Sequence, residues 1–521
     1  MSPDALPPLL AGSLPPWDAT TPREVRHLVQ RPLDASVRTR IAPAPSGELH
    51  VGNVRSALYN WALARRHGGT FLLRVEDTDR SRATDEAYVA LQGVLHWLGL
   101  TWDEGPGVGG PHAPYRQSER LELHRHALQL LLESGAAYRA FDTPEELEAQ
   151  REAQRAAKQP PRYDGTRWRG LSREESDALA AEGKAFVVRF AVPPGVTTWR
   201  DAVRGDVTID HREIPDFTLA RADGHPLYML AAAVDDALMG LTYVVRGEDL
   251  TTATPRQLLL YAALGLPADA WPTFGHLPLL IGDDKKPLSK RNGEVSVAWY
   301  RDHGFLPEAL VNYLALLGWS LPGDREFFAA DEMIAAFSLD RVSKNPARFD
   351  IRKLEALNGD WIRGLSVAEL ARRVEPWLAR AVPGPLDVER LQAAVPLVQE
   401  RLNRLDAVGP QLGFLFTPGP VVVDEAARAK SLLPESLPPL QAAYDVLSAL
   451  TVWAVEAIEA ALRTALVEGL GLKPRLAFAP VRVAVTGSSF SPPLFESLEL
   501  LGRDETLERL ARAIADLSAS E

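Results

Sequence analysis

One stretch, from Val37 to Glu76, constrains the fold of this chain more than any other. A short apolar run at 38–42 enters a loop rich in Pro and Gly, and a helix-favouring segment follows from Val54 to Arg66. That segment stops at Gly68-Gly69, where a helix C-terminus is expected, and a second apolar run covers 71–75. Strand, loop, helix and strand in this order form a βαβ unit, which implies a parallel sheet with a right-handed crossover.

The loop between the first strand and the helix, PAPSGELHVGN at 43–53, is where a ligand is expected. In an open α/β sheet, ligands bind at the carboxyl ends of the strands, and N–H groups at a helix N-terminus favour phosphate. His50 can donate hydrogen bonds to phosphate oxygens, and Gly52 allows a flat base to approach the backbone. The residues HVGN alone also suit an ordinary turn, so this interpretation depends on what surrounds them.

Composition limits the class of protein. The chain has 521 residues, enough for several domains, and its 46% hydrophobic and 24% charged residues are ordinary for a globular protein. It lacks Cys, which excludes disulfides and thiolate zinc sites. No apolar run could span a bilayer and no secretory h-region is present, so we expect a cytoplasmic location and no membrane partner. Because the net charge is −12, any surface for RNA has to be a local basic patch.

The order of patterns predicts an α/β Rossmann-type domain with a parallel sheet and an α+β insertion, followed by an all-α C-terminal half. The first residues are rich in Pro with little periodicity, so we expect a disordered extension there. The expected boundaries are 1–36 for the extension, 37–115 and 226–285 for the split sheet domain, 116–225 for the insertion, 286–365 for a further domain and 366–521 for the helical region, which divides near 423.

Local signals predict where several elements begin. Thr143-Pro-Glu-Glu146 and Thr254-Pro-Arg-Gln257 have the form of capping boxes, with Thr as the N-cap and Glu or Gln three residues later. Ser366 is expected to cap another helix, and Asp223-Gly224 is a hairpin signal.

In its context, following the residues R-x-A-P-x-P-S-G that begin at Arg40, the HVGN loop resembles the HIGH signature of class I aminoacyl-tRNA synthetases, in the form used by the glutamyl branch. Asn53 replaces the second His of that signature. The string GDDKKPLSKRNG at 282–293 resembles the KMSKS loop, which is the other class I signature. Pro287 stands at the first Lys position of that loop and Lys290 at the second.

The formation of an aminoacyl adenylate explains why such residues are needed. When a carboxylate attacks the α-phosphate of ATP, negative charge builds up on the phosphoryl oxygens and on the departing pyrophosphate, and a Lys such as Lys290 stabilises it. No general base is required, because the attacking carboxylate is already ionised. Mg²⁺ is implied by the pyrophosphate chemistry rather than by a cluster of ligands. The alternative interpretation of KKPLSKR is a solvated basic loop.

A third group of residues would choose the amino acid. Arg40 and Glu76 lie at the ends of the first two strands, and Tyr228 and Arg246 lie in the returning half of the sheet domain. Two Arg and a Tyr suit a side-chain carboxylate, because guanidinium binds carboxylate in a bidentate fork, and Glu76 suits an ammonium group. Any one of these residues by itself also suits an ordinary surface charge.

The resemblance to the glutamyl-tRNA synthetase family extends over nearly the whole chain from Val37. The matching strings are RIAPAPSGELHVGN, RVEDTD, DEGPGVGGPHAPYRQSER, VDDALMG, VVRGEDL, KKPLSKRNG and FLPEALVNYLALLGWS. The family implies that His50 and Lys290 are catalytic. The residues it implies for ATP are Pro43, His50, Gly52, Asn53, Asp249, Leu250, Ser289, Lys290 and Arg291. For glutamate it implies Arg40, Tyr228 and Arg246 at the side-chain carboxylate, Glu76 at the α-amino group, and Ala42 and Ala44 in the loop.

The chain departs from the family pattern at a few positions. Ala232 stands where some relatives place Asn, so one contact to the amino acid is missing or replaced by water. Some bacterial members carry a Cys-based zinc site after the string AYRAFDT, but Ala140 and Asp142 stand in those places, so no zinc is expected.

The resemblance also assigns the parts of the chain that would bind tRNA. The insertion at 116–225 would receive the acceptor end, 286–365 would be a stem-contact domain, and 366–521 would read the anticodon. Arg401, Arg482 and Ser491 fall where relatives place residues facing anticodon bases, which are read by stacking and by hydrogen bonds to base edges. The alternative for a lone Arg on a helical bundle is a surface residue.

The activity implied is ATP-dependent attachment of L-glutamate to the 3′ end of its tRNA, through a glutamyl-adenylate and with release of AMP and pyrophosphate. A monomer is expected, since no dimerisation helix is evident. The alternatives are glutaminyl-tRNA synthetase, a shortened relative that glutamylates a tRNA base, an inactive RNA-binding paralogue, and a small-molecule nucleotidyltransferase. Whether the glutamine tRNA is also charged stays open.

Overall fold

The computed structural model describes residues 13–29, 31–34, 36–79, 84–159, 162–288 and 296–519. The backbone divides into two compact units. The first unit contains 1–299 and 311–350, and the second contains 300–310 and 351–521. Helix α10 (Pro307–Leu316) contributes residues to both units.

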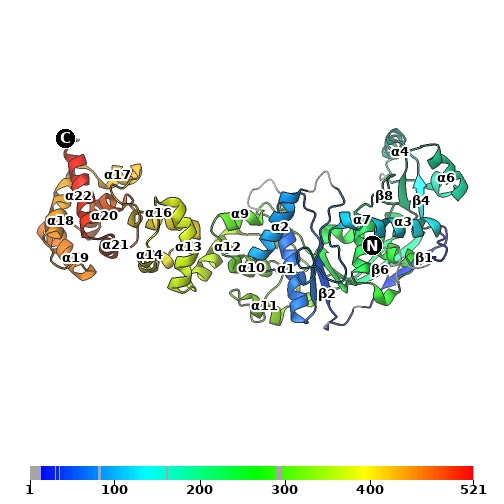
Figure 1. The fold of residues 1–521 in the computed structure, drawn as a ribbon, viewed down its shortest axis with the longest axis horizontal. Coiled ribbons are helices and arrows are strands. Elements are labelled where there is room, and N and C mark those ends of the chain that lie inside the picture. The colour runs from blue at the N-terminus through cyan, green and yellow to red at the C-terminus, as the bar shows by residue number, and fades with distance from the viewer. Residues whose placement is uncertain are drawn as a thin grey trace. The chain divides into compact units, whose positions relative to one another are not determined.

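The predicted βαβ unit is present in the first unit. It consists of β2 (Arg38–Ile41), α1 (Val51–Arg66) and β3 (Thr70–Leu73), and the two strands pair in parallel with Arg40 opposite Leu72. Helix α1 lies beside β2 (Figure 1) and begins at Val51 rather than at the predicted Val54. The turn after α1 requires glycine at Gly69, because a Cβ atom there would come within 2.0 Å of the Val37 carbonyl oxygen.

The sheet resumes after the insertion. Helix α7 (Tyr228–Leu238) leads into β9 (Tyr243–Gly247), and α8 (Thr254–Ala263) leads into β10 (Thr273–Leu277), which pairs in parallel with β9. The Thr242 N–H donates to the Arg38 carbonyl at 3.0 Å, so the β9–β10 pair adjoins the β2–β3 pair. Both halves of the split domain therefore end their parallel strands at the same edge.

The insertion is α+β, as predicted. Strands β4 (Ala137–Ala140), β5 (Val187–Phe190) and β8 (Thr218–Ala220) form an antiparallel sheet, and β6 (Gly195–Asp201) pairs with β7 (Gly205–Asp210). The capping box at Thr143 is confirmed at the start of α4 (Pro144–Ala156), and the Asp223-Gly224 turn is closed by a bond from Arg221 N to His225 O of 3.0 Å. The insertion also contains α3 (Leu121–Glu133), α5 (Thr166–Arg169) and α6 (Arg173–Ala181).

The predicted disorder of 1–36 is wrong for its second half. Strand β1 (Arg23–His27) pairs in parallel with β6 of the insertion, with Arg23 opposite Gly195. Trp17 is buried, and its indole N–H donates to the Ala191 carbonyl at 3.1 Å. The partners of this segment lie far along the chain, so its own periodicity could not indicate them. Residues 1–12, 30 and 35 lie outside the described part of the chain.

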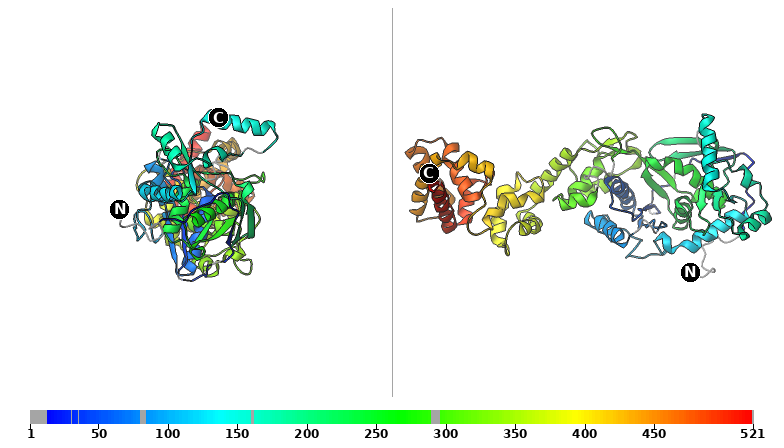
Figure 2. Two further views of the ribbon diagram at one scale, coloured as in Figure 1. Left: turned by 90° about the vertical axis from the view of Figure 1, so that its right-hand side faces the viewer. Right: turned by 90° about the horizontal axis from the view of Figure 1, so that it is seen from above.

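The second unit is helical. Its long helices are α12 (Ile351–Arg363), α13 (Val367–Ala381), α18 (Leu437–Ser448), α20 (Pro474–Thr486) and α22 (Arg503–Ser518). Ser366 caps α13 as predicted, since its hydroxyl accepts from the Glu369 N–H. Figure 2 shows these helices in yellow-green to red, and no strand follows β12 (Ala347–Arg348) among the residues described.

The remaining α-helices and strands, apart from short 3₁₀ and π-helical turns, complete the described fold. They are α2 (Asp85–Trp97), α9 (Val297–Asp302), α11 (Ala330–Ala336), α14 (Val388–Ala394), α15 (Pro396–Gln399), α16 (Val408–Leu412), α17 (Glu425–Ser431), α19 (Val455–Leu462), α21 (Leu494–Leu501) and β11 (Leu280–Ile281). None of the described helices combines the length and the apolar character that crossing a bilayer requires.

Candidate active site

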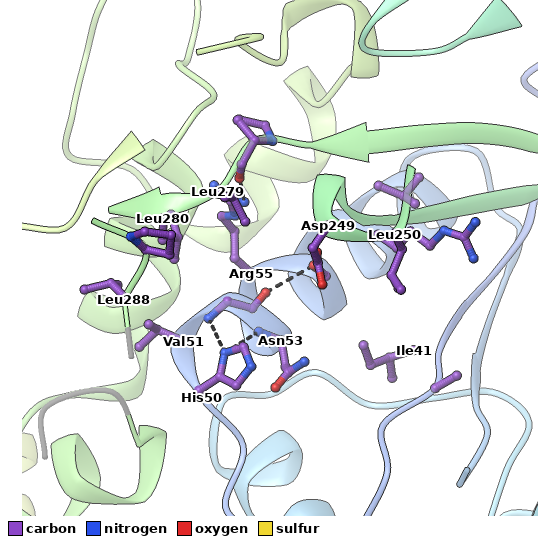
Figure 3. Close-up of a pocket in the computed structure, with 18 of the residues that line it drawn as sticks. Ile41, His50, Val51, Asn53, Arg55, Asp249, Leu250, Leu279, Leu280 and Leu288 are labelled. Carbon is purple, nitrogen blue, oxygen red and sulfur yellow. Dashed lines mark hydrogen bonds between the residues drawn. The ribbon is translucent and has the colours of Figure 1, made fainter. Parts of the chain in front are cut away.

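A cavity of about 470 Å³ opens at the carboxyl ends of β2 and β9, as predicted for a parallel sheet. Figure 3 shows its walls, with His50 just before α1, Asn53 in the first turn of α1, and Asp249 and Leu250 on the opposite side. The predicted site residues that line it are Arg40, Ala42, His50, Gly52, Asn53, Glu76, Tyr228, Arg246, Asp249 and Leu250. Pro43 and Ala44 belong to the same loop but do not line the cavity, and Ser289, Lys290 and Arg291 lie outside the described residues.

His50 caps helix α1 with its side chain. The imidazole Nδ1 accepts from the N–H groups of Gly52 at 3.1 Å and Asn53 at 3.3 Å. In the neutral ring Nε2 then carries the proton, so the ring presents a donor from that nitrogen. Gly52 is needed for this geometry as well as for ligand approach, because a Cβ atom there would lie 3.0 Å from the imidazole.

Arg40 is held in a buried network of alternating charges. Its guanidinium donates two bonds of 3.2 Å to Asp236 on α7, and Arg74 donates to the same carboxylate at 2.7 Å. Arg74 also reaches Glu76 at 3.2 Å. Burial opposes charge on Asp236, yet Arg40 and Arg74 together hold the pKa of this carboxyl below its usual value. The two arginines and the two carboxylates of this network balance in charge.

Arg246 is different, because it is buried without an anion. Its guanidinium donates to His276 Nε2 at 3.3 Å, to the Thr254 hydroxyl at 2.8 Å and to the Tyr228 hydroxyl at 3.5 Å. None of the described carboxylates forms an ion pair with it, and burial lowers the pKa of its guanidinium. A positive charge that faces the cavity without compensation favours an anionic ligand.

The predicted capping box at Thr254 is wrong. The N-cap of α8 is Ala253, without a side-chain bond to the helix, so the expected capping box is absent. The Thr254 hydroxyl instead accepts from Arg246 and lies 3.0 Å from His276 Nε2. The local sequence T-P-R-Q is typical of a helix cap. The Thr254 hydroxyl does not cap the helix, because it accepts a hydrogen bond from the buried Arg246 guanidinium instead.

The chain before 289–295 lines the cavity, and the chain after it pairs with the loop that contains His50. Pro287 and Leu288 line it, and Leu288 N donates to Leu280 O at 3.0 Å. On the other side Ser296 forms an antiparallel bridge with His50, and Val297 N donates to Leu49 O at 3.0 Å. The described residues before 289 therefore line the cavity, and those after 295 pair with the HVGN loop.

Comparison with known proteins decides the family. The family model described as "tRNA synthetases class I (E and Q), catalytic domain" matches residues 36–356, and "Anticodon binding domain" matches residues 369–514. A protein of Nocardioides sp. named glutamate–tRNA ligase is 51% identical over 488 residues, which cover 92% of this chain and 99% of that protein. The chain belongs to the glutamate–tRNA ligase family. A member from Streptomyces avermitilis is 49% identical over 489 residues, covering 92% of this chain and 96% of that one.

A solved member of the glutamate–tRNA ligase family has the same fold. The crystal structure of the ligase from Elizabethkingia meningosepticum, in complex with its amino acid, superposes with a TM-score of 0.82 at 33% identity. The match covers 92% of this chain and 100% of that one. The expected Rossmann-type catalytic domain and helical C-terminal half are confirmed by these matches and by the structure.

The positions where this family member departs from the expected pattern can also be located. Ala232 is fully buried on α7 and does not line the cavity. Asp142 accepts from the Tyr163 hydroxyl at 2.6 Å and from the Trp168 indole N–H at 2.7 Å. Its carboxylate thus joins β4 to α5 where some family members were expected to bind zinc, and no group of His, Asp and Glu side chains suited to a metal occurs among the described residues.

The second unit of this glutamate–tRNA ligase family member contains a polar cavity of about 540 Å³. Arg401, Arg482 and Ser491, the predicted anticodon residues, all line it. Arg482 donates to the Ser491 hydroxyl at 2.5 Å and to the Pro492 carbonyl at 2.7 Å. Phe490, which sequence reasoning missed, lies at the same cavity and is 89% exposed.

Proposed function

We propose that this chain attaches L-glutamate to the 3′ end of the glutamate tRNA, using ATP and passing through a glutamyl-adenylate. The observation that carries the choice of amino acid is Arg246, a buried guanidinium at the cavity without an anionic partner among the described residues. A neutral glutamine side chain would leave this charge uncompensated in a medium of low dielectric constant, which is costly. A glutamate carboxylate supplies the missing charge.

Glutamate is proposed to bind between the two halves of the sheet domain. Its side-chain carboxylate would meet Arg246 and Arg40, with the Tyr228 hydroxyl as a third donor. Burial raises the pKa of the Tyr228 hydroxyl, so it stays protonated and can donate. The α-amino group would meet Glu76, the carboxylate of the network that also lines the cavity. Asp236 keeps Arg40 in place before glutamate arrives.

ATP is proposed to bind along the N-terminus of α1. The His50 Nε2–H and the N–H groups of the first turn favour its phosphates, and Asp249 and Leu250 on the opposite wall suit the ribose and adenine. ATP enters as its Mg²⁺ complex, which neutralises part of the phosphate charge. Lys290, with Ser289 and Arg291, is proposed to stabilise the departing pyrophosphate, because the residues on both sides of this segment contact the site.

The formation of the adenylate then needs positioning rather than proton transfer. The α-carboxylate of glutamate attacks the α-phosphorus of ATP, the bond from this phosphorus to the bridging oxygen breaks, and pyrophosphate leaves. The terminal ribose hydroxyl of the tRNA then attacks the acyl carbon, its proton passes to the phosphate of the departing AMP, and AMP leaves. The 116–225 insertion is proposed to receive the acceptor end, and the cavity at Arg401, Arg482 and Ser491 to receive anticodon bases.

Pyrophosphate exchange tests the proposed function directly. Exchange of labelled pyrophosphate into ATP should depend on glutamate and should be negligible with glutamine, in the presence of the glutamate tRNA. Exchange with glutamine but not with glutamate would exclude the proposal in favour of the glutaminyl alternative. The same assay with and without tRNA shows whether activation requires bound RNA, as the family resemblance implies.

Two variants separate the activation site from the RNA site. Lys290→Ala should abolish exchange and leave tRNA affinity unchanged, with the exposed Lys344→Ala as a matched control. Arg401→Ala should weaken tRNA binding by about 10-fold, the loss of roughly one hydrogen bond by a charged group, and leave the glutamate KM unchanged at saturating tRNA. Activation that survives in Lys290→Ala would exclude the proposed role of that loop.

A further inference from the structure

The guanidinium of Arg246 is held on two sides by residues that the proposed mechanism does not use. His276 Nε2 lies 3.3 Å from Arg246 Nε, and the Thr254 hydroxyl lies 2.8 Å from Arg246 Nη2. Arg246 is on β9, and His276 is its direct neighbour on the parallel strand β10. These contacts fix the plane of the guanidinium that faces the cavity.

His276 is itself held by a carboxylate from the insertion. Asp201, the last residue of β6, accepts from His276 Nδ1 through Oδ2 at 2.5 Å. Its other oxygen, Oδ1, accepts three backbone N–H groups, from Val203 at 3.0 Å, Arg204 at 2.9 Å and His276 at 3.1 Å. Both Asp201 and His276 are buried, so this arrangement is rigid.

This geometry determines which ring nitrogen carries the proton. Because Asp201 is an acceptor only, Nδ1 of His276 carries the hydrogen, and Nε2 presents a lone pair that the Arg246 Nε–H and the Thr254 hydroxyl share. Burial lowers the pKa of the His276 imidazole, while the hydrogen bond from His276 helps to hold the pKa of the Asp201 carboxyl below its usual value against the effect of burial. The ring is therefore neutral, and it orients Arg246 without cancelling its charge.

We propose that Asp201 and His276 are positioning residues that align Arg246 for the side-chain carboxylate of the substrate and thereby set the preference for an acidic amino acid. This inference rests on the proposed function, in which Arg246 binds that carboxylate. A carboxylate in direct contact with Arg246 would orient it equally well but would neutralise it. A neutral imidazole with a fixed tautomer between Arg246 and Asp201 keeps the charge available to the substrate.

Asp201→Asn is the most informative variant. The three N–H groups at Oδ1 require an oxygen there, so the amide of Asn has to place its NH₂ group at the position of Oδ2. That group donates to His276 Nδ1, and the ring proton moves to Nε2, which can then donate to the Thr254 hydroxyl 3.0 Å away. The Nε–H of Arg246 thereby loses its acceptor on His276, and the guanidinium loses the contact that aligns it. We expect the glutamate KM to rise about 10- to 100-fold, as for one lost bond to a charged group, with the ATP KM unchanged.

A pair of variants at His276 tests the same idea without Asn at 201. The amide of Gln reaches the position of Nε2 and can accept from Arg246, whereas the amide of Asn reaches only the position of Nδ1. His276→Gln should therefore retain a lower glutamate KM than His276→Asn. Asp216→Asn is the matched control, because Asp216 is also buried in the insertion and accepts from the Tyr138 hydroxyl at 2.5 Å but does not contact the cavity.

Arg246→Gln distinguishes this inference from the proposed function. If Arg246→Gln leaves the glutamate KM unchanged, the proposed glutamate site is wrong. If Arg246→Gln raises that KM but Asp201→Asn leaves it within about twofold of wild type, the positioning inference is overturned and the proposed function stands. Should Asp201→Asn fail to fold, a glutamate KM that is equal in the two His276 variants, or higher in His276→Gln, overturns the inference. A higher KM in His276→Asn supports it.

Discussion

Arg40 donates two hydrogen bonds of 3.2 Å to the buried carboxylate of Asp236. Asp236 also accepts from Arg74 at 2.7 Å, so one α7 carboxylate holds an arginine of β2 and the arginine that directly follows β3. The helix after the insertion is thus tied to the strands before it. This bond places the guanidinium of Arg40 at the cavity before any substrate binds, which reduces the entropy cost of ordering it.

Asp236→Asn should therefore reduce both stability and glutamate binding. Two buried arginines would lose their carboxylate, and breaking a buried pair in this way costs about 3–5 kcal/mol. We expect a loss of that size in the free energy of unfolding, measured by urea denaturation, and a rise in the glutamate KM. Asp206→Asn is the control, because Asp206 pairs with Arg200 at the surface, where such a pair contributes about 0–1 kcal/mol. Equal stability of the two variants would contradict the role given to Asp236.

Glu76→Gln should separate stability from function. Burial raises the pKa of Glu76 above its ordinary value, although Arg74 and Arg40 lower it. The folded state then binds this proton more tightly than the unfolded state, so the stability contribution of Glu76 falls as pH rises from the ordinary pKa through the raised one. The Gln variant lacks this titration. We expect it to be at least as stable as wild type at pH 7.5, and to lose about 10- to 100-fold in glutamate affinity because the ammonium partner is gone.

Urea denaturation at acidic and neutral pH measures the first part of this prediction, and the glutamate KM measures the second. The stability advantage of Glu76→Gln should shrink as the pH falls towards the ordinary glutamate pKa, where wild-type Glu76 becomes protonated. A Gln variant that is clearly less stable than wild type at pH 7.5 would mean that attraction by Arg74 and Arg40 outweighs the cost of burial.

The residues of the cavity that sequence reasoning identified are those in short contiguous motifs. HVGN follows a strand and precedes a helix. The change of the hydrophobic pattern from that of a strand to that of a helix therefore places His50 and Gly52 at the sheet edge. Arg40, Glu76 and Arg246 could be placed because each lies at the carboxyl end of an apolar run. Topology alone then brings them to one edge.

The residues that hold these cavity-lining side chains in place could not be found in this way. Asp236 lies within an apolar helix, His276 within an apolar strand, and Asp201 in the insertion, and each acts through a partner far along the chain. The Thr254 cap was predicted wrongly for the same reason, since local geometry competes with a tertiary bond. The helix motif VDDALMG, with two carboxylates among buried apolar residues, was the one available signal, because buried carboxylates require partners.

Trp17→Ala should destabilise the first unit, although the sequence around Trp17 predicted disorder. The ring packs against Phe190 with centroids 5.5 Å apart, and the Arg23 guanidinium lies 3.9 Å from the ring centroid. Truncating a buried Trp costs about 3–5 kcal/mol, so the thermal midpoint should fall by several degrees. Val29→Ala, at a position that is 78% exposed, should leave the midpoint unchanged. A midpoint unaffected by Trp17→Ala would indicate that this segment does not contribute to the fold in solution.

Asp142 should stabilise the insertion without a metal. Its two oxygens accept from the Tyr163 hydroxyl and the Trp168 indole N–H. One carboxylate therefore connects the end of β4 to α5. Asp142→Ala would leave the buried indole N–H and the half-buried hydroxyl without these acceptors, at a cost of about 1–3 kcal/mol each. Asp142→Asn is the matched variant, because its oxygen can still accept one of the two bonds, so its loss should be the smaller. A zinc-selective chelator should leave the activity and the thermal midpoint of the wild-type protein unchanged, because the contacts of Asp142 with Tyr163 and Trp168 are hydrogen bonds and involve no metal. Loss of activity on chelation, restored by added Zn²⁺, would show that a metal and not Asp142 stabilises this part of the insertion.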